Sequence, residues 1–249
     1  MILDSCLGKL FQNAFKCELI VVRLNSNAIP ATGWTLSHLL SPSNSTLLVE
    51  IQREVESARR PDGTIDISTL IGLPYLNSAF NETLRMYTDV LVTRTLDEDL
   101  TLNQYHMKKG GIIIAPSFLG HHDTEMWAQG NMPPDHIWFG ERFIKQDEKT
   151  GKAVFSTART NGKFFPFGGG PYVCPGRVFA KQEVFGAIAA FLLEYEVQFV
   201  EYLRLGKHGN RISKGVHPNG FPVVKKQFCG SGIVISEGDM LVKLKRRKW

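Results

Sequence analysis

The sequence predicts a mainly helical α+β protein, and three observations lead to this prediction. Amphipathic segments with apolar residues at helical spacing occupy the first third of the chain. A long apolar-rich segment follows a glycine-rich loop in the second half, and short strand-like segments dominate the remainder. Helices followed by strands is the order expected of this class. The 249 residues are 43% apolar and 21% charged, which excludes disorder, collagen-like repeats and coiled coil.

The elements can be placed in order along the chain. Helices are expected over residues 12–40, 47–59, 74–87 and 177–194. Pro30 should kink or interrupt the first helix, and Pro74 should open the third. Strands are expected at residues 90–95, 111–115, 197–203, 221–224, 232–236 and 239–245. Residues 117–170 show little periodicity, and a loop tract of this length is uncommon in a compact domain unless it has a function.

Charge and cysteine content exclude several functions. Five of the basic residues behind the net charge of +5 lie in the last seven positions, at Lys243, Lys245, Arg246, Arg247 and Lys248. The rest of the chain is balanced, so no broad nucleic-acid surface is indicated, and the tail alternates like a terminal strand. The cysteines are far apart and form no CxxC pair, so neither a disulfide nor a zinc site is expected. No secretory signal or membrane-spanning segment is evident.

The most unusual segment is the loop around Cys174. Gly168, Gly169 and Gly170 precede this cysteine, and Pro175-Gly176 follows it at the start of the last helix. Glycines let the backbone approach a flat ligand, and the free N–H groups at a helix start stabilise a thiolate. These surroundings suit an axial iron ligand. The other interpretation is a buried cysteine that packs as a small apolar residue.

The segment FGGGPYVCPG resembles the haem-binding signature FxxGxxxCxG of the cytochrome P-450 haem-thiolate monooxygenases. Its fixed positions are Phe167, Gly170, Cys174 and Gly176. The resemblance implies a haem cofactor whose iron takes the Cys174 thiolate as axial ligand. It also implies that the other signature residues contact the haem.

Two further motifs of the family occur in the expected order. Glu82 and Arg85, in NETLRMY, match the ExxR pair, and Arg142, in WFGERF, resembles the arginine of the PERF segment. Gly140 stands where proline is common. The resemblance implies a structural network of these three side chains behind the haem. Without it, Glu82 and Arg85 would be read as an ordinary solvated ion pair at i, i+3.

Residues 26–40 resemble the long distal helix that crosses the haem in this family. The pattern N-x-x-P-A, from Asn27 to Ala31, resembles the branch containing sterol 7α-hydroxylases, 12α-hydroxylases and prostacyclin synthase. By resemblance, Asn27 takes the polar distal position, Thr32 is a second catalytic candidate, and substrate lies between Ala28 and Thr32. The alternative is that Asn27 only interrupts the helix beside Pro30.

Two departures from the family pattern affect the propionate contacts. Tyr172 stands where Arg or His is common, two residues before the cysteine, and supplies a hydrogen bond but no charge. Arg94 resembles another propionate-binding arginine that compensates; the alternative is an exposed cation on a strand. His121 and His122 are assigned no ligand role.

The function that the resemblance implies needs more of the P-450 fold than these residues are expected to provide. Residues 1–249 are expected to form one partial domain, the C-terminal half of the P-450 fold, without the N-terminal membrane anchor and substrate-recognition loops. The implied activity is oxidation of a hydrophobic small molecule, such as a sterol, terpenoid or other secondary metabolite, using O2 and electrons from an NADPH-cytochrome P-450 reductase at the endoplasmic reticulum. The chain alone is expected to bind haem weakly or not at all, because half a fold leaves apolar surface exposed.

Two alternatives stay open. The first is a prostacyclin-synthase-like rearrangement of a peroxide, which needs no reductase. The second is a catalytically silent fragment. Nucleic-acid binding through the basic tail is disfavoured, because no aromatic residues are interleaved with a wider basic surface. Substrate identity lies beyond the sequence.

Overall fold

A computed structural model describes residues 27–160, 162–205, 211–213, 224 and 230–247. The longer helices are α3 (Ala28–Leu39), α4 (Ser45–Ser57), α6 (Pro74–Tyr87) and α9 (Arg177–Glu194). Short helices are α5 (Ile67–Leu70), α7 (Ser117–His121), α8 (Thr124–Trp127) and the 3-10 turns Pro42–Asn44, Ala158–Thr160 and Gly170–Tyr172. The mainly helical α+β class predicted from the sequence is confirmed.

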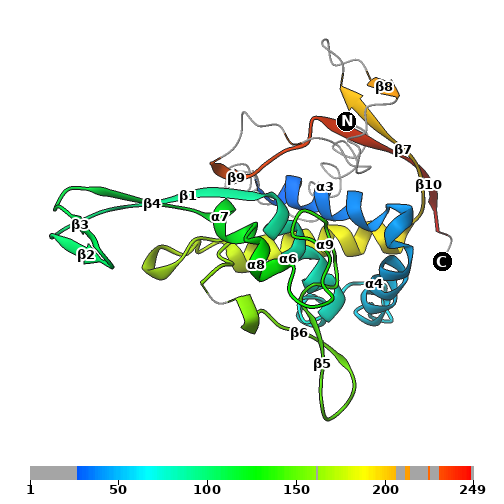
Figure 1. Ribbon diagram of the computed structural model, residues 1–249. Helices are drawn as coiled ribbons and strands as arrows, with labels where there is room; N and C mark the ends of the chain where they lie inside the picture. Colours follow the sequence, from blue (N-terminus) through cyan, green and yellow to red (C-terminus); the bar gives the residue numbers. More distant parts are fainter. Residues whose placement is uncertain (1–26, 161, 206–210, 214–223, 225–229, 248–249) are drawn as a thin grey trace.

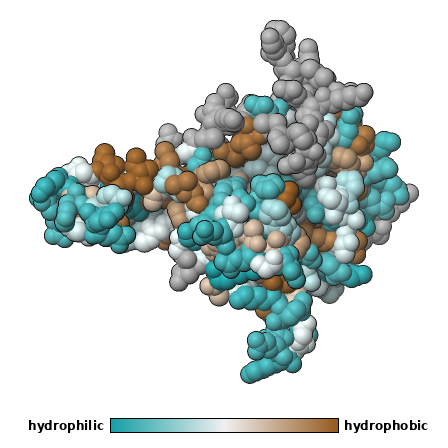
Figure 2. All heavy atoms as spheres, in the orientation of Figure 1, coloured by the Kyte–Doolittle hydropathy of each residue, from teal (hydrophilic) through white to brown (hydrophobic). Residues whose placement is uncertain are grey.

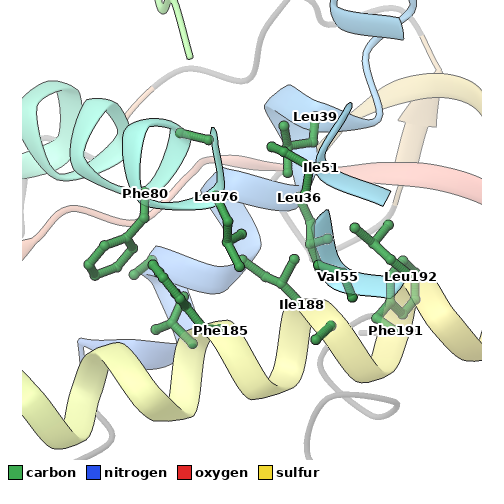
Figure 3. Close-up of a cluster of buried hydrophobic side chains, with 14 of the residues drawn as sticks. Leu36, Leu39, Ile51, Val55, Leu76, Phe80, Phe185, Ile188, Phe191 and Leu192 are labelled. Carbon is green, nitrogen blue, oxygen red and sulfur yellow. The ribbon is translucent and has the colours of Figure 1, made fainter. Parts of the chain in front are cut away.

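Helices α3, α4, α6 and α9 pack around one hydrophobic core (Figure 3). Leu36 of α3, Ile51 of α4, Leu76 of α6 and Ile188 of α9 meet there, and each side chain is fully buried. Helix α9 is apolar on nearly all sides because α3, α4 and α5 all pack against it.

The start of α6 is fixed by a side chain from another helix. Both carboxylate oxygens of Glu54, on α4, accept backbone N–H groups of Tyr75 and Leu76 at 2.9 Å. Pro74 occupies the first helical position, where its missing N–H costs nothing. The predicted bounds of α6, residues 74–87, are confirmed.

The strands form small antiparallel sheets. Strand β1 (Thr88–Thr95) pairs with β4 (Ile112–Pro116) and β9 (Ser231–Ile233), whereas β7 (Tyr195–Leu205) pairs with β10 (Gly238–Arg246) and β8 (Arg211–Ser213). Two hairpins join β2 (Leu100–Leu102) with β3 (Tyr105–Met107) and β5 (Ile144–Gln146) with β6 (Ala153–Phe155). In Figure 1, β1 and β4 form an arm that projects from the helices, with the β2–β3 hairpin at its tip.

The structure bears on three sequence expectations in different ways. Helix α3 begins at Ala28, so Pro30 lies in its first turn and causes no break; residues 12–26 of the predicted helix lie outside the described residues. The strand predicted at 221–224 also lies outside them, except for Val224. Lys243, Lys245 and Arg246 of the basic tail lie in β10, as the expected terminal strand, and Lys245 pairs with Glu196 on β7 at 3.0 Å.

The molecular surface is apolar in one conspicuous place. Figure 2 shows hydrophobic residues along the β1–β4 arm, and Leu91, Ile112 and Ile114 are exposed there. None of the helices described by the structure is both long and apolar enough to cross a bilayer.

Candidate functional site

A cavity of about 420 Å³ lies between the first turns of α3, the second half of α6, strand β1 and the start of α9. The cysteine loop, residues 166–176, forms one wall. Most lining side chains are apolar or small. The lining residues are Asn27, Ala28, Ala31, Phe80, Leu84, Thr88, Val90, Leu91, Val92, Thr93, Arg94, Pro166, Phe167, Gly168, Tyr172, Cys174, Gly176, Phe179, Ala180, Val184, Gly232 and Ile233.

Cys174 is an exposed free thiol on the wall of this cavity. Its backbone N–H donates to the carbonyl of Phe167 at 2.9 Å, which closes the cysteine loop. Gly168 and Gly170 have φ values of 75° and 65°, in the left-handed region that favours glycine. The interpretation of Cys174 as a buried apolar residue is therefore wrong. Gly170 itself is not part of the cavity wall and serves the loop conformation.

Helix α9 begins directly after the cysteine. Gly176 lies on the cavity wall and is the N-cap residue of α9. The N-terminus of a helix carries partial positive charge, which favours a thiolate beside it. Ala180 and Val184 extend the same wall along the helix.

Arg94 and Tyr172 lie together at the edge of the cavity. The Arg94 guanidinium lies over the Tyr172 ring at 4.8 Å and donates to the carbonyl of Gly169 at 3.3 Å. Tyr172 is 76% exposed. Tyr172, which stands where Arg or His is common in the family, thus packs against Arg94, the residue expected to replace the missing positive charge.

Asn27 lines the cavity and also joins two elements. Its Oδ1 accepts the backbone N–H of Ile233 on β9 at 3.0 Å. A Cβ atom on Gly232 would lie 2.4 Å from the same Oδ1, so only glycine fits there. Asn27 therefore holds β9 against the start of α3, in addition to presenting a polar group to the cavity.

Thr32 requires a correction. The sequence placed it beside substrate, but its side chain is fully buried and is not part of the cavity wall. Its hydroxyl donates to the carbonyl of Ala28, one turn earlier in α3, at 2.8 Å. Small side chains at Ala28 and Ala31 form the part of α3 that faces the cavity.

Behind the cavity, Glu82, Arg85 and Arg142 form one buried network, and all three side chains are fully inaccessible. Arg85 donates from Nε to Glu82 Oε2 at 2.8 Å and from Nη2 to Oε1 at 2.9 Å. Arg142 Nε contacts the same two oxygens at 3.0 and 3.1 Å. The alternative of a solvated surface pair is therefore wrong for Glu82 and Arg85.

Backbone carbonyls of the aperiodic tract complete this network. Arg85 donates to the carbonyls of His121 and Asp135, at 2.8 and 2.7 Å. Arg142 donates to those of Trp127 and Ile137, at 2.6 and 2.9 Å. Burial lowers the pKa of Arg142, and the adjacent Glu82 opposes that shift. Two guanidinium groups thus tie down the segment from 121 to 142, whose regular secondary structure is limited to the end of α7 and the short helix α8.

The glycine in WFGERF has a steric explanation. A Cβ atom on Gly140 would lie 2.3 Å from Leu47 Cδ2 and 2.6 Å from the Trp138 ring. Any larger side chain, including the proline common in the family, would require the side chain of Leu47 or Trp138 to move.

His121 is a structural residue of the loop. Its Nε2 accepts the backbone N–H of Phe165 at 3.1 Å, and burial lowers the pKa of this fully inaccessible imidazole to about 3. His122 stacks on Phe118, with centroids 4.4 Å apart. Within the described part of the chain, no group of three or more His, Cys, Asp or Glu side chains is arranged to hold a metal ion.

Comparison with known proteins decides the family. The cytochrome P-450 family model matches residues 28–204. The chain belongs to the cytochrome P-450 family. The cytochrome P-450 monooxygenase calL of Penicillium decumbens is 31% identical over 230 residues, which are 89% of this chain and 40% of calL. Cholesterol 7-alpha-monooxygenase of Cricetulus griseus is 30% identical over 192 residues, 71% of this chain and 36% of that protein.

A solved structure supports the fold. The heme domain of a mutant cytochrome P-450DA superposes with a TM-score of 0.61 at 18% identity, covering 89% of this chain and 41% of that one. The chain therefore has part of the P-450 fold, as predicted. It spans about 40% of the length of the curated relatives it matches.

Several cavity residues were not predicted from the sequence as site residues. Phe80 and Leu84 were assigned only to the apolar stripe of α6, yet they also line the cavity. Gly232 and Ile233 reach the site because β9 pairs with β1, a long-range contact that no local pattern reveals. For the wall formed by α9, the local feature of the sequence that pointed to the site was Gly176 at the start of this helix.

Proposed function

We propose that this chain provides the proximal part of a haem-thiolate monooxygenase that oxidises a hydrophobic small molecule. The observation that carries the proposal is the exposed Cys174 thiol on the wall of a mostly apolar cavity. The family to which the chain belongs supports haem as the cofactor. The relatives with this segment are named monooxygenases.

The residues present fit a haem. Small residues at Ala28, Ala31, Gly168 and Ala180 line the cavity, where their side chains leave room for a large ring, and Phe80 and Leu84 supply an apolar wall. The thiol is the soft donor that suits iron. An apolar cavity with few polar groups is the usual form of a cofactor site.

Each polar residue then has a role toward the cofactor. Cys174 would hold the iron through its sulfur, directly before the start of α9. Arg94, held over Tyr172, would bind a propionate carboxylate. Glu82, Arg85 and Arg142 would keep the loop from 121 to 142 in place and perform no chemistry.

The bound haem would supply activation of O2, for which thiolate ligation is suited. On the opposite wall, Ala28 and Ala31 would leave room for substrate beside the ring. Asn27 would present its amide there as the polar distal group. The apolar wall would exclude water from the reacting face.

The relatives narrow the substrate class. The N-x-x-P-A pattern at Asn27–Ala31 is consistent with the similarity to cholesterol 7-alpha-monooxygenase and cytochrome P-450 7A1. The similarity to the fungal calL supports a secondary metabolite instead. We propose a sterol or terpenoid-sized hydrophobic substrate, an NADPH-cytochrome P-450 reductase as electron donor, and a site of action at the endoplasmic reticulum membrane.

One observation favours a second candidate, rearrangement of a peroxide. The Thr32 hydroxyl donates to the Ala28 carbonyl and does not line the cavity, so the described lining contains no hydroxyl from this residue for proton delivery. A peroxide rearrangement needs no such delivery and no reductase.

The test joins this chain to the N-terminal part of calL, because the chain covers only 40% of that relative. The joined protein is assayed with a reductase, NADPH and a sterol panel, and separately with a lipid peroxide alone. NADPH-dependent oxygen insertion that Cys174→Ser abolishes and Cys229→Ser spares is the expected result. Turnover of the peroxide alone would favour the second candidate. A haem-loaded protein that is inactive in both assays would support the silent fragment.

A further inference from the structure

A buried pair of hydrogen-bonded side chains, Tyr87 and His38, lies outside the cavity, in the interface between α3 and α6. The Tyr87 hydroxyl and His38 Nε2 are 2.7 Å apart, and both side chains are buried. Trp34 stacks on Tyr87 with centroids 3.8 Å apart at 6°, and Trp138 stacks on His38 at 4.5 Å and 8°. The four rings form a continuous series, Trp34–Tyr87–His38–Trp138, which we call the aromatic stack.

The protonation states at its centre are set by burial. Burial lowers the pKa of His38 well below its ordinary value, so the imidazole is neutral at physiological pH. Burial also raises the pKa of Tyr87, so the phenol keeps its proton. With the imidazole proton on Nδ1, the phenol O–H donates to Nε2. The ionisable groups that act on Tyr87 are Glu82 and Arg85, already paired with each other, and Tyr202 on β7.

A phenol hydrogen-bonded to a neutral base is chemically distinct from other buried phenols. Removing an electron from a phenol makes its O–H strongly acidic, so oxidation is easier when a base takes the proton in the same step. The electron-rich indole of Trp34 lies flat against the phenol and stabilises electron deficiency on it. The protonated His38 would lie against the face of Trp138, a favourable cation–π geometry.

Two rings of the stack are close in sequence to residues of the cavity wall. Tyr87 directly precedes Thr88, and Trp34 follows Ala31 by one helical turn; both Thr88 and Ala31 line the cavity. The Trp34 indole is held by a hydrogen bond to the carbonyl of Val234 at 2.7 Å.

We propose that Tyr87 and His38 form a redox-active pair that accepts one oxidising equivalent from a one-electron oxidant. In this step Tyr87 gives one electron to the oxidant, and its hydroxyl proton moves to Nε2 of His38. The products are a neutral tyrosyl radical, an imidazolium and the oxidant reduced by one electron. An electron from a thiol or ascorbate-type reductant, with return of the proton from His38, restores the phenol. The pair thereby removes oxidising equivalents from the interior, a role that does not depend on the proposed function.

The test uses the chain without haem, so it can fail independently of the haem proposal. Tris(bipyridine)ruthenium(III), generated by a laser flash with persulfate, is the oxidant. The background carries Tyr105→Phe and Tyr172→Phe, because these phenols are 66% and 76% exposed and would be oxidised directly. Transient absorbance and freeze-quenched electron paramagnetic resonance detect the tyrosyl radical.

The matched control is Tyr202→Phe, because Tyr202 is also buried but its hydroxyl donates to the carbonyl of Ser37, which is not a base. The radical should be lost in Tyr87→Phe and retained in Tyr202→Phe. His38→Gln keeps an acceptor without a base and should slow radical formation roughly a hundredfold, the usual contribution of a positioned base. Equal radical yields in Tyr87→Phe and its parent, or an unchanged rate in His38→Gln, would overturn the proposal.

A measurement without core substitutions covers the case in which these variants do not fold. In the background protein, proton transfer to an internal base should make the rate independent of pH between about 7 and 9, where neither partner titrates. A rate that rises across this range, as expected when the proton is released to solvent, would also overturn the proposal.

Discussion

The Glu82 network and the Cys174 cavity lie on neighbouring parts of the fold, but they differ in the number and the burial of their polar groups. In the network, one carboxylate and two guanidinium groups are fully buried, and backbone carbonyls satisfy their remaining donors. In the cavity, polar groups are few, and the thiol of Cys174 is exposed. The network is complete without a ligand, whereas the cavity presents a donor and apolar walls to one.

Because of this difference, substitutions in the network and at Cys174 should have different effects. Changes in the network should mainly lower the free energy of unfolding, because they leave buried charges unpaired. Changes at Cys174 should leave stability nearly intact and remove binding. The predictions below test this separation.

The largest effect is expected for Glu82→Gln. The substitution removes the only carboxylate between Arg85 and Arg142 and should lower the free energy of unfolding by about 3–5 kcal/mol. Urea denaturation measures the change. The control is Glu50→Gln, because Glu50 pairs with Arg53 on the exposed face of α4 and should cost at most about 1 kcal/mol. Equal losses in the two variants would refute a buried network.

Acid should destabilise the fold through its buried histidines. The pKa values of His38 and His121 are lowered on folding, so the unfolded chain binds more protons below its histidine pKa of about 6.5. Stability should be complete above that pH and fall by about 1.4 kcal/mol per pH unit for each histidine, down to about pH 3 for His121. Urea denaturation at several pH values measures the slope.

The histidine control is His106→Gln, which removes an exposed histidine in place of a buried one. His121→Gln should reduce the slope of stability against pH by the contribution of one histidine, whatever its effect on stability at neutral pH. An unchanged slope in His121→Gln would mean that His121 is not held neutral.

Gly140→Ala should cost about 1–3 kcal/mol, because its Cβ would overlap Leu47 and Trp138 and overpack the contact between α4 and the loop. Gly33→Ala is the opposite case. Gly33 lies within α3 with no atom within 4 Å of a new Cβ, so alanine should stabilise the helix by up to about 1 kcal/mol. Thermal denaturation compares the two variants. An unchanged melting temperature in Gly140→Ala would show that the side chains of Leu47 and Trp138 move aside at little cost.

Cys174→Ser should change stability least, by no more than about 0.5 kcal/mol, because the thiol is exposed. Chemical denaturation without haem measures it. A loss comparable to that of Glu82→Gln would indicate that Cys174 serves the fold rather than a ligand.

The sequence predicted the helices better than the site. Pro74 and the Pro175-Gly176 pair mark helix starts by local chemistry, so α6 and α9 were placed correctly. The partners of Arg142 were not predictable, because they are backbone carbonyls of a loop without periodicity. Thr32 was misplaced although it follows Ala28 by one turn on the same side of α3, because spacing along the helix does not show where the cavity wall ends: Ala28 and Ala31 line the cavity, whereas the Thr32 side chain is buried and does not.

The central claim is that Cys174 is the iron ligand of this cavity, and its reactivity tests that claim most directly. The chain is treated with iodoacetamide alone, with excess ferric haem and with excess iron-free protoporphyrin, and alkylation of each cysteine is followed by peptide mass spectrometry. Cys174 should react readily without haem, be protected by ferric haem, and be protected much less by the iron-free ring. Equal reactivity of Cys174 with and without ferric haem, or equal protection by both porphyrins, would contradict the account.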